Sequence, residues 1–505
     1  MNGDGIGDLA GIRSHLEYLH DLGVDAIWLS PWYPSPMADA GYDVADYRDI
    51  DPVFGTLAEA EALIAEAHAV GIRTIVDIVP NHTSTAHVWF AEALAGGPMR
   101  DRFYFRAGRD GRPPNNWESI FGGPAWTQVA DDQWYLHLFD SGQPDLNWDH
   151  PAVRAEFDDI LRFWFDRGVD GIRIDSAAMV AKDPALPDFD PLMPPDPHPW
   201  IDREALHELY RGWRRIADSY HPSRALIGEV WLPDPQRFVR YLRPDELHTA
   251  FNFDFLGCPW DAKALRRCID ETLTTHAAVG APATWVLSNH DVTRHVTRYG
   301  RTDTGFSHDL RQARHQLPTD LALGTRRARA AALLTLALPG SVYVYQGEEL
   351  GLPEVEDIAA ADRQDPIFLR SAGTDPGRDG CRVPLPWSGS APPYGFGGTG
   401  WLPQPDDWAE RTVATQIADD QSMLNLYRRA LRLRRALPGL GDGPSEWQDS
   451  ADDVLAFDRP HGFTCVVNLS ARPVAVPAGT VLIASTPIID GVLPPDAAVW
   501  VSTAL

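Results

Sequence analysis

The chain has 505 residues, 44% of them hydrophobic, and a formal net charge of −27. This length accommodates one large domain with insertions and a small terminal domain. The negative charge would repel nucleic-acid phosphates, so we expect no nucleic-acid partner. No apolar run is long enough to span a bilayer, and the first residues lack the basic and apolar segments of a signal peptide. We therefore expect no membrane partner.

The cysteines add a prediction about the compartment. The four of them are widely separated and lack the spacing of metal ligands: Cys258, Cys268, Cys381 and Cys465. That pattern is typical of a reduced intracellular protein, so we expect a cytoplasmic location.

The first residues of the chain resemble a calcium-binding loop. Residues 2–8 follow the D-x-[DN]-x-[DN]-G pattern, with possible oxygen ligands at Asn2, Asp4, Ile6 and Asp8. The leading aspartate of such a loop would fall before Met1, so a loop without a bound ion fits equally well. We expect weak or no binding of a structural Ca²⁺ ion here.

Apolar strands alternate with amphipathic helices along most of the chain. The predicted strands are 24–30, 72–79, 171–175, 225–229, 250–253, 285–291 and 341–346. The predicted helices are 12–22, 57–70, 152–167, 202–219, 234–242, 326–338 and 423–437. This alternation is typical of parallel βαβ units and predicts an α/β fold, a (β/α)8 TIM barrel.

Two departures from the alternation suggest further domains. Residues 83–143 are a polar stretch rich in Gly, Pro and aromatics, too long for a barrel loop, and we interpret them as an inserted subdomain. Residues 438–505 contain short apolar runs separated by Pro, Gly and Asp, which predicts a C-terminal β-sandwich domain. The catalytic barrel then comprises residues 1–82 and 144–437.

Three of the predicted strands run into an acidic residue: Asp175, Glu229 and Asp291. In a barrel, such positions meet at the mouth where active sites form. Glycoside cleavage needs paired carboxylates, one ionised and one protonated. Arg173 lies on the same strand face as Asp175 and would hold it ionised, as a nucleophile must be. The neighbours of Glu229 form a less polar setting that would keep it protonated, as an acid must be.

Short motifs in these segments resemble the signature regions of one enzyme family. Asp77-Ile-Val-Pro-Asn-His82, Gly171-Ile-Arg-Ile-Asp175, Gly228-Glu-Val-Trp231 and Ser288-Asn-His-Asp291 resemble, in order, four regions of the α-amylase family of glycoside hydrolases. Residues 143–147, QPDLN, resemble the fifth region of the oligo-1,6-glucosidase and α-glucosidase subgroup. Residues 378–382, RDGCR, resemble a loop of that subgroup.

The resemblance implies a retaining, exo-acting α-glucosidase that needs no cofactor for catalysis and works as a monomer or homodimer. Asp175 would be the nucleophile, Glu229 the general acid and base, and Asp291 the group that stabilises the transition state. The implied substrate-binding residues are Tyr42, Asp43, His82, Arg173, Ser176, His290 and Arg382. Tyr42 would stack beneath the sugar, and Asp43 would pair with Arg382 to close the pocket.

Two positions depart from the family pattern. The family's barrel begins with a strand ahead of the residue 2–8 loop, so we expect that strand to be missing between strands 24–30 and 341–346. We also expect a chain extended by that strand to be more soluble and to melt higher, because unpaired strand edges promote aggregation. Ser176 follows the nucleophile where α-1,6-specific members carry valine, which favours α-1,4 linkages such as those of maltose and short oligosaccharides.

Other functions use the same residues differently. The chain could be an oligo-1,6-glucosidase, or a relative of the trehalose-forming type that passes glucose to a sugar. A truncated, inactive paralogue would lack activity altogether. Amylase-like heavy chains that partner membrane transporters are a non-enzymatic alternative, but they carry a membrane span and lose catalytic carboxylates.

Overall fold

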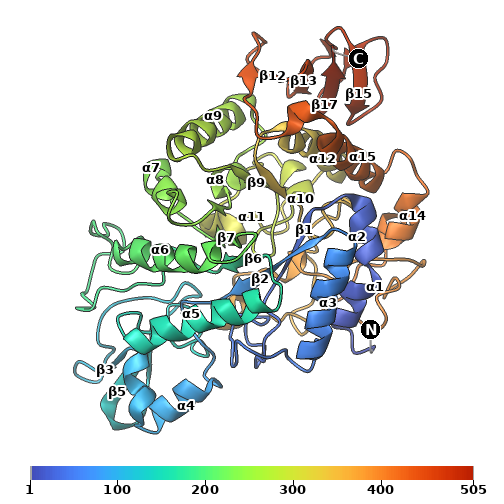
Figure 1. The fold of residues 1–505 in the computed structure, drawn as a ribbon. Coiled ribbons are helices and arrows are strands. Elements are labelled where there is room, and N and C mark those ends of the chain that lie inside the picture. Colours follow the sequence, from blue (N-terminus) through green and yellow to red (C-terminus); the bar gives the residue numbers. More distant parts are fainter. Residues whose placement is uncertain (1–2, 504–505) are drawn as a thin grey trace.

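The computed structural model describes residues 3–503 (Figure 1). Its centre is a five-stranded parallel sheet whose order follows the chain. The five strands are β1 (Ala26–Leu29), β2 (Arg73–Ile78), β6 (Gly171–Ile174), β7 (Ala225–Gly228) and β8 (Thr249–Ala250). A separate parallel pair is formed by β9 (Thr284–Val286) and β10 (Ser341–Tyr343). The predicted strands all exist, and the α/β alternation is confirmed.

Helices connect these strands and cover their outer side, as Figure 1 shows. The long ones are α3 (Leu57–Ala69), α5 (Pro151–Asp166), α6 (Ala205–Asp218), α9 (Ala262–Val279), α12 (Leu321–Ala337) and α15 (Met423–Ala436). Most begin at side chains that accept from the free amides of the first turn, such as Thr56, Asp261 and Asp320. Thr56 and Glu59 form a full capping box.

The strand ladder is interrupted beside β1 and β10. No pairing joins these two strands within residues 3–503. All four residues of β1 are only half-buried and Ser341 of β10 is exposed, whereas every residue of β6 is buried. The rings of Trp28 and Tyr343 still meet across the gap, with centroids 6.5 Å apart. We call the unpaired edges of β1 and β10 the seam; it is the place where the sequence predicts a missing strand.

The inserted region forms its own small layer beside α5. Strands β3 (Phe105–Ala107), β4 (Trp126–Gln128) and β5 (Gln133–Leu136) pair antiparallel in the order β3-β5-β4. Helix α4 (Val88–Leu94) precedes them. The buried residues of this small layer include Tyr104, Trp117, Trp126, Leu136 and Leu138. This layer lies at the lower left of Figure 1, apart from the C-terminal strands.

The last part of the chain is an antiparallel sheet in the order β11-β12-β13-β17-β15. Its strands are β11 (Glu446–Trp447), β12 (Val454–Arg459), β13 (Phe463–Asn468), β15 (Thr480–Ala484) and β17 (Ala497–Ser502). One face packs on α12, where Trp500 Nε1 donates to the Leu333 carbonyl at 3.0 Å. The other face is covered by a two-stranded ribbon of β14 (Val474–Ala475) and β16 (Val492–Leu493).

Several predicted elements differ from the structure: the strand predicted over 285–291 ends at Val286, and the helix predicted over 326–338 begins at Leu321. Two further differences have a clear local cause. The helix predicted over 12–22 is two helices, α1 (Leu9–Ser14) and α2 (Leu16–Leu22), because His15 leaves helical geometry and its Nδ1 lies 2.8 Å from the Gly11 carbonyl oxygen. The strand predicted over 250–253 ends at Ala250, because the Asn252 side chain accepts from the Phe255 amide and starts helix α8 (Phe253–Gly257).

Candidate active site

One guanidinium gathers three carboxylates at the ends of adjacent strands. Arg173 lies on β6, in register with Asp77 on β2. Its Nη1 contacts Asp175 Oδ1 at 2.7 Å and both oxygens of Asp77 at 3.0 Å, and its Nη2 contacts Glu229 Oε2 at 2.7 Å. All four side chains are buried. The structure therefore brings the first two predicted strand-end acids onto a single cation.

This cluster has three carboxyl groups and one guanidinium, so its charges do not cancel if all the acids are ionised. Burial raises the pKa of Asp175 well above its usual range and that of Asp77 to about 7, although Arg173 opposes both shifts. The predicted contact between Arg173 and Asp175 is confirmed, but the expectation that it holds Asp175 ionised overlooked burial and the two other acids that share Arg173. Asp77 and Asp175 share Arg173, and the charge of Asp77 adds to the rise in the pKa of Asp175.

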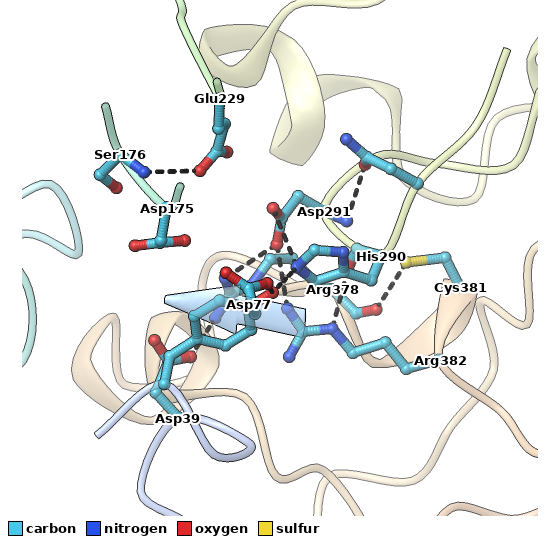
Figure 2. Close-up of polar contacts among 12 residues, drawn as sticks. Asp39, Asp77, Asp175, Ser176, Glu229, His290, Asp291, Arg378, Cys381 and Arg382 are labelled. Carbon is cyan, nitrogen blue, oxygen red and sulfur yellow. Dashed lines mark hydrogen bonds and ion pairs between the residues drawn. The ribbon is translucent and has the colours of Figure 1, made fainter. Parts of the chain in front are cut away.

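Glu229 lies in a more polar setting than we expected. Its Oε2 also accepts from the Ser176 amide at 2.8 Å, the contact drawn in Figure 2, and its Oε1 accepts from Trp231 Nε1 at 3.1 Å. The expected less polar setting is wrong, because the chain folds two N–H donors besides Arg173 back onto the carboxyl group. Ser176 adopts a left-handed backbone conformation (φ 46°), and its amide orients Glu229.

Asp291 lies across the site between two arginines (Figure 2). Its Oδ1 accepts from Arg378 Nη1 and Arg382 Nη2, both at 3.0 Å, and His290 Nε2 lies 3.4 Å from Oδ2. Burial alone would raise the pKa of Asp291, but the charges of Arg378 and Arg382 outweigh burial and hold the pKa below its usual range. Asp291 is therefore a fixed anion at this site.

The predicted tyrosine and histidines line the same site. Tyr42 donates to Asp77 Oδ2 at 3.1 Å, and its hydroxyl lies 2.9 Å from His290 Nε2. His82 Nε2 lies 3.2 Å from the Tyr42 carbonyl and 3.1 Å from Gln143 Nε2. Burial lowers the pKa of both His82 and His290 to about 3, so each is a neutral hydrogen-bonding group at neutral pH.

The predicted pair between Asp43 and Arg382 is wrong. The Asp43 carboxylate accepts from the amides of Ala38 and Asp39, at 3.0 and 3.1 Å, and so shapes its own loop. Arg382 instead donates to Asp291 and to the His290 carbonyl. Asp43 therefore stabilises the loop that contains Ala38 and Asp39.

A different pair, Arg378 and Asp39, joins the two loops that Asp43 and Arg382 were predicted to join. The Nη2 atom of Arg378 donates to Asp39 Oδ1 at 2.7 Å, its Nε to Asp365 Oδ2 at 2.7 Å, and its Nη1 to Asp291. Gln143 Nε2 donates to the other Asp39 oxygen at 3.1 Å. The loop around Arg378 is thereby tied to the loop before α3 at one end of the site.

The sequence contained weak signals for these missed residues. Asp39 and Asp43 both flank Tyr42, and Arg378 and Arg382 occupy the same short motif, so spacing does not say which acid meets which arginine. Asp77 had a clearer signal, since an acid inside an otherwise apolar strand needs a buried partner.

Two of the predicted calcium ligands, Asp4 and Asp8, accept from backbone amides near them. Asn2 lies outside the described residues. The Asp8 side chain accepts from the Gly11 amide and caps α1, and Asp4 Oδ1 accepts from the Ile6 amide at 2.9 Å. Within residues 3–503, no three His, Cys, Asp or Glu side chains gather as metal ligands would. In the same range, no helix is both long and apolar enough to cross a bilayer.

Comparison with known proteins decides the family. Residues 1–443 match the family described as alpha amylase, catalytic domain. The chain belongs to the α-amylase family. It is a glycoside hydrolase of that family's α-glucosidase type; the four signature motifs predicted the family, and residues 143–147 and 378–382 predicted the subgroup. Membership and the structural likeness given next imply a (β/α)8 barrel with a C-terminal β domain, although the seam interrupts the hydrogen-bonded ring in this chain.

Three similar proteins illustrate the range of named activities. A probable alpha-glucosidase of Rhizobium meliloti is 39% identical, covering 93% of this chain and 86% of its own length. An oligo-1,6-glucosidase of Parageobacillus thermoglucosidasius is 34% identical, covering 86% of this chain and 80% of its own length. The solved structure of an alpha-glucosyl transfer enzyme has a TM-score of 0.86 at 35% identity, covering 99% of this chain and 96% of that one.

Proposed function

We propose that this α-amylase family member is a retaining, exo-acting α-glucosidase that releases terminal glucose from maltose and short α-1,4-linked oligosaccharides. The observation that carries the proposal is the shared contact of Asp175 and Glu229 with Arg173. Carboxyl groups held by neighbouring nitrogens of one guanidinium suit the spacing of about 5–5.5 Å that retaining enzymes use.

The reaction has two steps in this proposal. Asp175 attacks the anomeric carbon while Glu229 gives its proton to the departing oxygen, so that a covalent β-glucosyl intermediate forms. Glu229, now a carboxylate, then takes a proton from water; the water oxygen attacks the same carbon and displaces Asp175. Asp291 is a fixed anion beside this centre, placed to bind sugar hydroxyls and stabilise the positive charge of the transition state.

Exo-action is supported by the contacts that surround Arg378. Its bonds to Asp39, Asp365 and Asp291 join separate loops at one end of the site, an arrangement that would close that end to a long polysaccharide. His82, His290 and Tyr42 provide neutral polar groups for sugar hydroxyls, as the family resemblance implies.

The α-1,4 preference rests on Ser176, and transfer of glucose to a sugar is the second candidate. The similarity to the alpha-glucosyl transfer enzyme favours transfer, because the same covalent intermediate serves both reactions. The two functions differ only in whether water or a sugar attacks the intermediate.

Chromatography and NMR of the products from maltose, isomaltose, sucrose and trehalose test these proposals. We expect α-glucose as the first product and faster release from maltose than from isomaltose. β-Glucose first, or long fragments from soluble starch, would contradict retention or exo-action. Disaccharide products that exceed free glucose would establish transfer instead.

A further inference from the structure

Trp231 contacts the proposed acid, Glu229, in a way that the family resemblance did not predict. It follows Glu229 by two residues in the loop after β7, and its indole Nε1 donates back to Glu229 Oε1 at 3.1 Å. Its ring stacks on Phe253, with coplanar rings and centroids 3.7 Å apart. The ring of His308 contacts the indole edge-on, with ring centroids 4.7 Å apart. Phe253, at the start of α8, and His308 therefore hold the indole in one orientation.

The two oxygens of Glu229 are not equivalent. Oε2 accepts from both the Ser176 amide and Arg173 Nη2, so its acceptor positions are occupied by donors. Oε1 accepts from Trp231. An indole N–H can only donate, and a carboxyl O–H must point away from donors. The proton that Glu229 gives to a leaving oxygen therefore belongs on Oε1.

Several charged groups surround the hydrogen bond between Trp231 and Glu229. Arg173 brings a positive charge to Oε2 of Glu229, and Asp77 and Asp175 share that cation. His308 is a further titratable neighbour of Glu229, on the loop side. The indole N–H adds to the groups that stabilise the carboxylate, without adding charge.

We propose that Trp231 is a positioning residue for Glu229, whose indole N–H orients the carboxyl group and stabilises the carboxylate that forms as the glycosidic bond breaks. This inference rests on the acid and base role proposed for Glu229. In the first step the proton leaves Oε1 for the leaving oxygen, and the indole bond strengthens as negative charge develops on Oε1. In the second step Oε1 takes a proton from water, and the indole bond weakens again.

The experiment compares Trp231→Phe, which removes the N–H but keeps an aromatic ring against Phe253, with Trp231→His, which keeps a ring N–H. The values of kcat/KM are measured on α-glucosides with activated (2,4-dinitrophenyl) and poor (4-methoxyphenyl) leaving groups, across pH. For Trp231→Phe we expect a loss of roughly 10-fold on the poor leaving group, since a hydrogen bond to a charged group contributes about 1.5–3 kcal/mol. The activated substrate should lose no more than about 3-fold, because it needs little proton transfer.

The pH profile provides a readout that a purely structural role would not move. In Trp231→Phe, the alkaline limb of kcat/KM should shift upward by roughly 0.5–1 pH unit, because a carboxylate that loses a donor holds its proton more tightly. In Trp231→His, the alkaline limb should return to its parent position, and kcat/KM on the poor leaving group should come within about 3-fold of the parent value. Phe253→Leu, the control, removes the stacking partner and keeps the N–H, so its limb should stay in place.

Three results would overturn the inference: an equal loss on both leaving groups in Trp231→Phe, an unmoved alkaline limb, or a Trp231→His variant no better than Trp231→Phe. Failure of the proposed function itself gives a different signature. Glu229→Gln would then lose no more activity on the poor leaving group than on the activated one, whatever the Trp231 variants do.

Discussion

Two regions of the parallel strands differ in burial and in the pairing of their polar groups. At the carboxyl ends of β6 and β7, Asp175, Glu229 and Arg173 are buried and each polar head group has a charged partner. At the seam, the residues of β1 and β10 are half-buried or exposed, and neither strand pairs with the other. Disruption at these strand ends therefore affects turnover, whereas disruption at the seam, between this sheet and the β9–β10 pair, affects folding alone.

Asp175→Asn tests the strand-end region most strongly. Loss of the nucleophile should lower kcat on maltose by roughly 10³-fold or more. The melting temperature should not fall, because removing one charge from three crowded carboxylates relieves repulsion. Single-turnover assays and calorimetry measure both. A variant with more than a tenth of the parent activity would show that another group attacks the sugar.

Arg173→Met should damage both properties together. Removing the cation leaves three buried carboxylates without a positive partner, which typically costs about 3–5 kcal/mol of folding free energy. Urea unfolding measures the loss, and Arg109→Met at the exposed surface pair with Asp188 is the control, expected to cost less than about 1 kcal/mol. Similar losses for the two variants would mean that the cluster is much more hydrated than its burial indicates.

Asp39→Asn and Asp43→Asn separate the pair seen in the structure from the pair that the sequence suggested. Asp39→Asn weakens a charged contact to Arg378 and should lower kcat/KM on maltose by roughly 10-fold or more. Asp43→Asn keeps an amide oxygen that can accept from the Ala38 and Asp39 amides, so its effect should be smaller. The reverse order of effects would restore the original assignment of Asp43.

Ser176→Val tests the linkage preference. Valine should raise the ratio of isomaltose to maltose turnover by a few fold, at roughly the 1–3 kcal/mol scale of single contacts in a pocket. It should also lower stability by about 1–2 kcal/mol, because a β-branched residue fits poorly at φ 46°. An unchanged ratio would remove Ser176 from the specificity argument and leave its amide bond to Glu229 as its role.

Hydrogen exchange provides the smallest and most local test, at the seam. Amides of β1 and β10 that face the gap should exchange faster than those of β6, which is paired on both sides. Mass spectrometry of peptides covering 24–30, 171–175 and 341–346 measures the difference. Equal protection would mean that the seam is closed in solution.

Some properties of this protein were determined by sequence alone. Apolar runs separated by amphipathic helices specify parallel βαβ units, because each run must be buried on both faces. The acids at the ends of three runs and the arginine two residues before Asp175 then follow from strand periodicity, which fixes the face but not the partner. The predicted helix was wrong at His15 and the predicted strand was wrong at Asn252, because at each position one side chain competes for backbone groups.

Tertiary structure alone decided which charges meet. Asp39 rather than Asp43 reaches Arg378, since the Asp43 carboxylate is used by two amides of its own loop. The polar surroundings of Glu229 come from a left-handed turn at Ser176 and an indole that folds back from Trp231, neither of which a periodic pattern encodes. Burial and the sharing of one guanidinium set the protonation of the acids, and both depend on residues far apart in the chain.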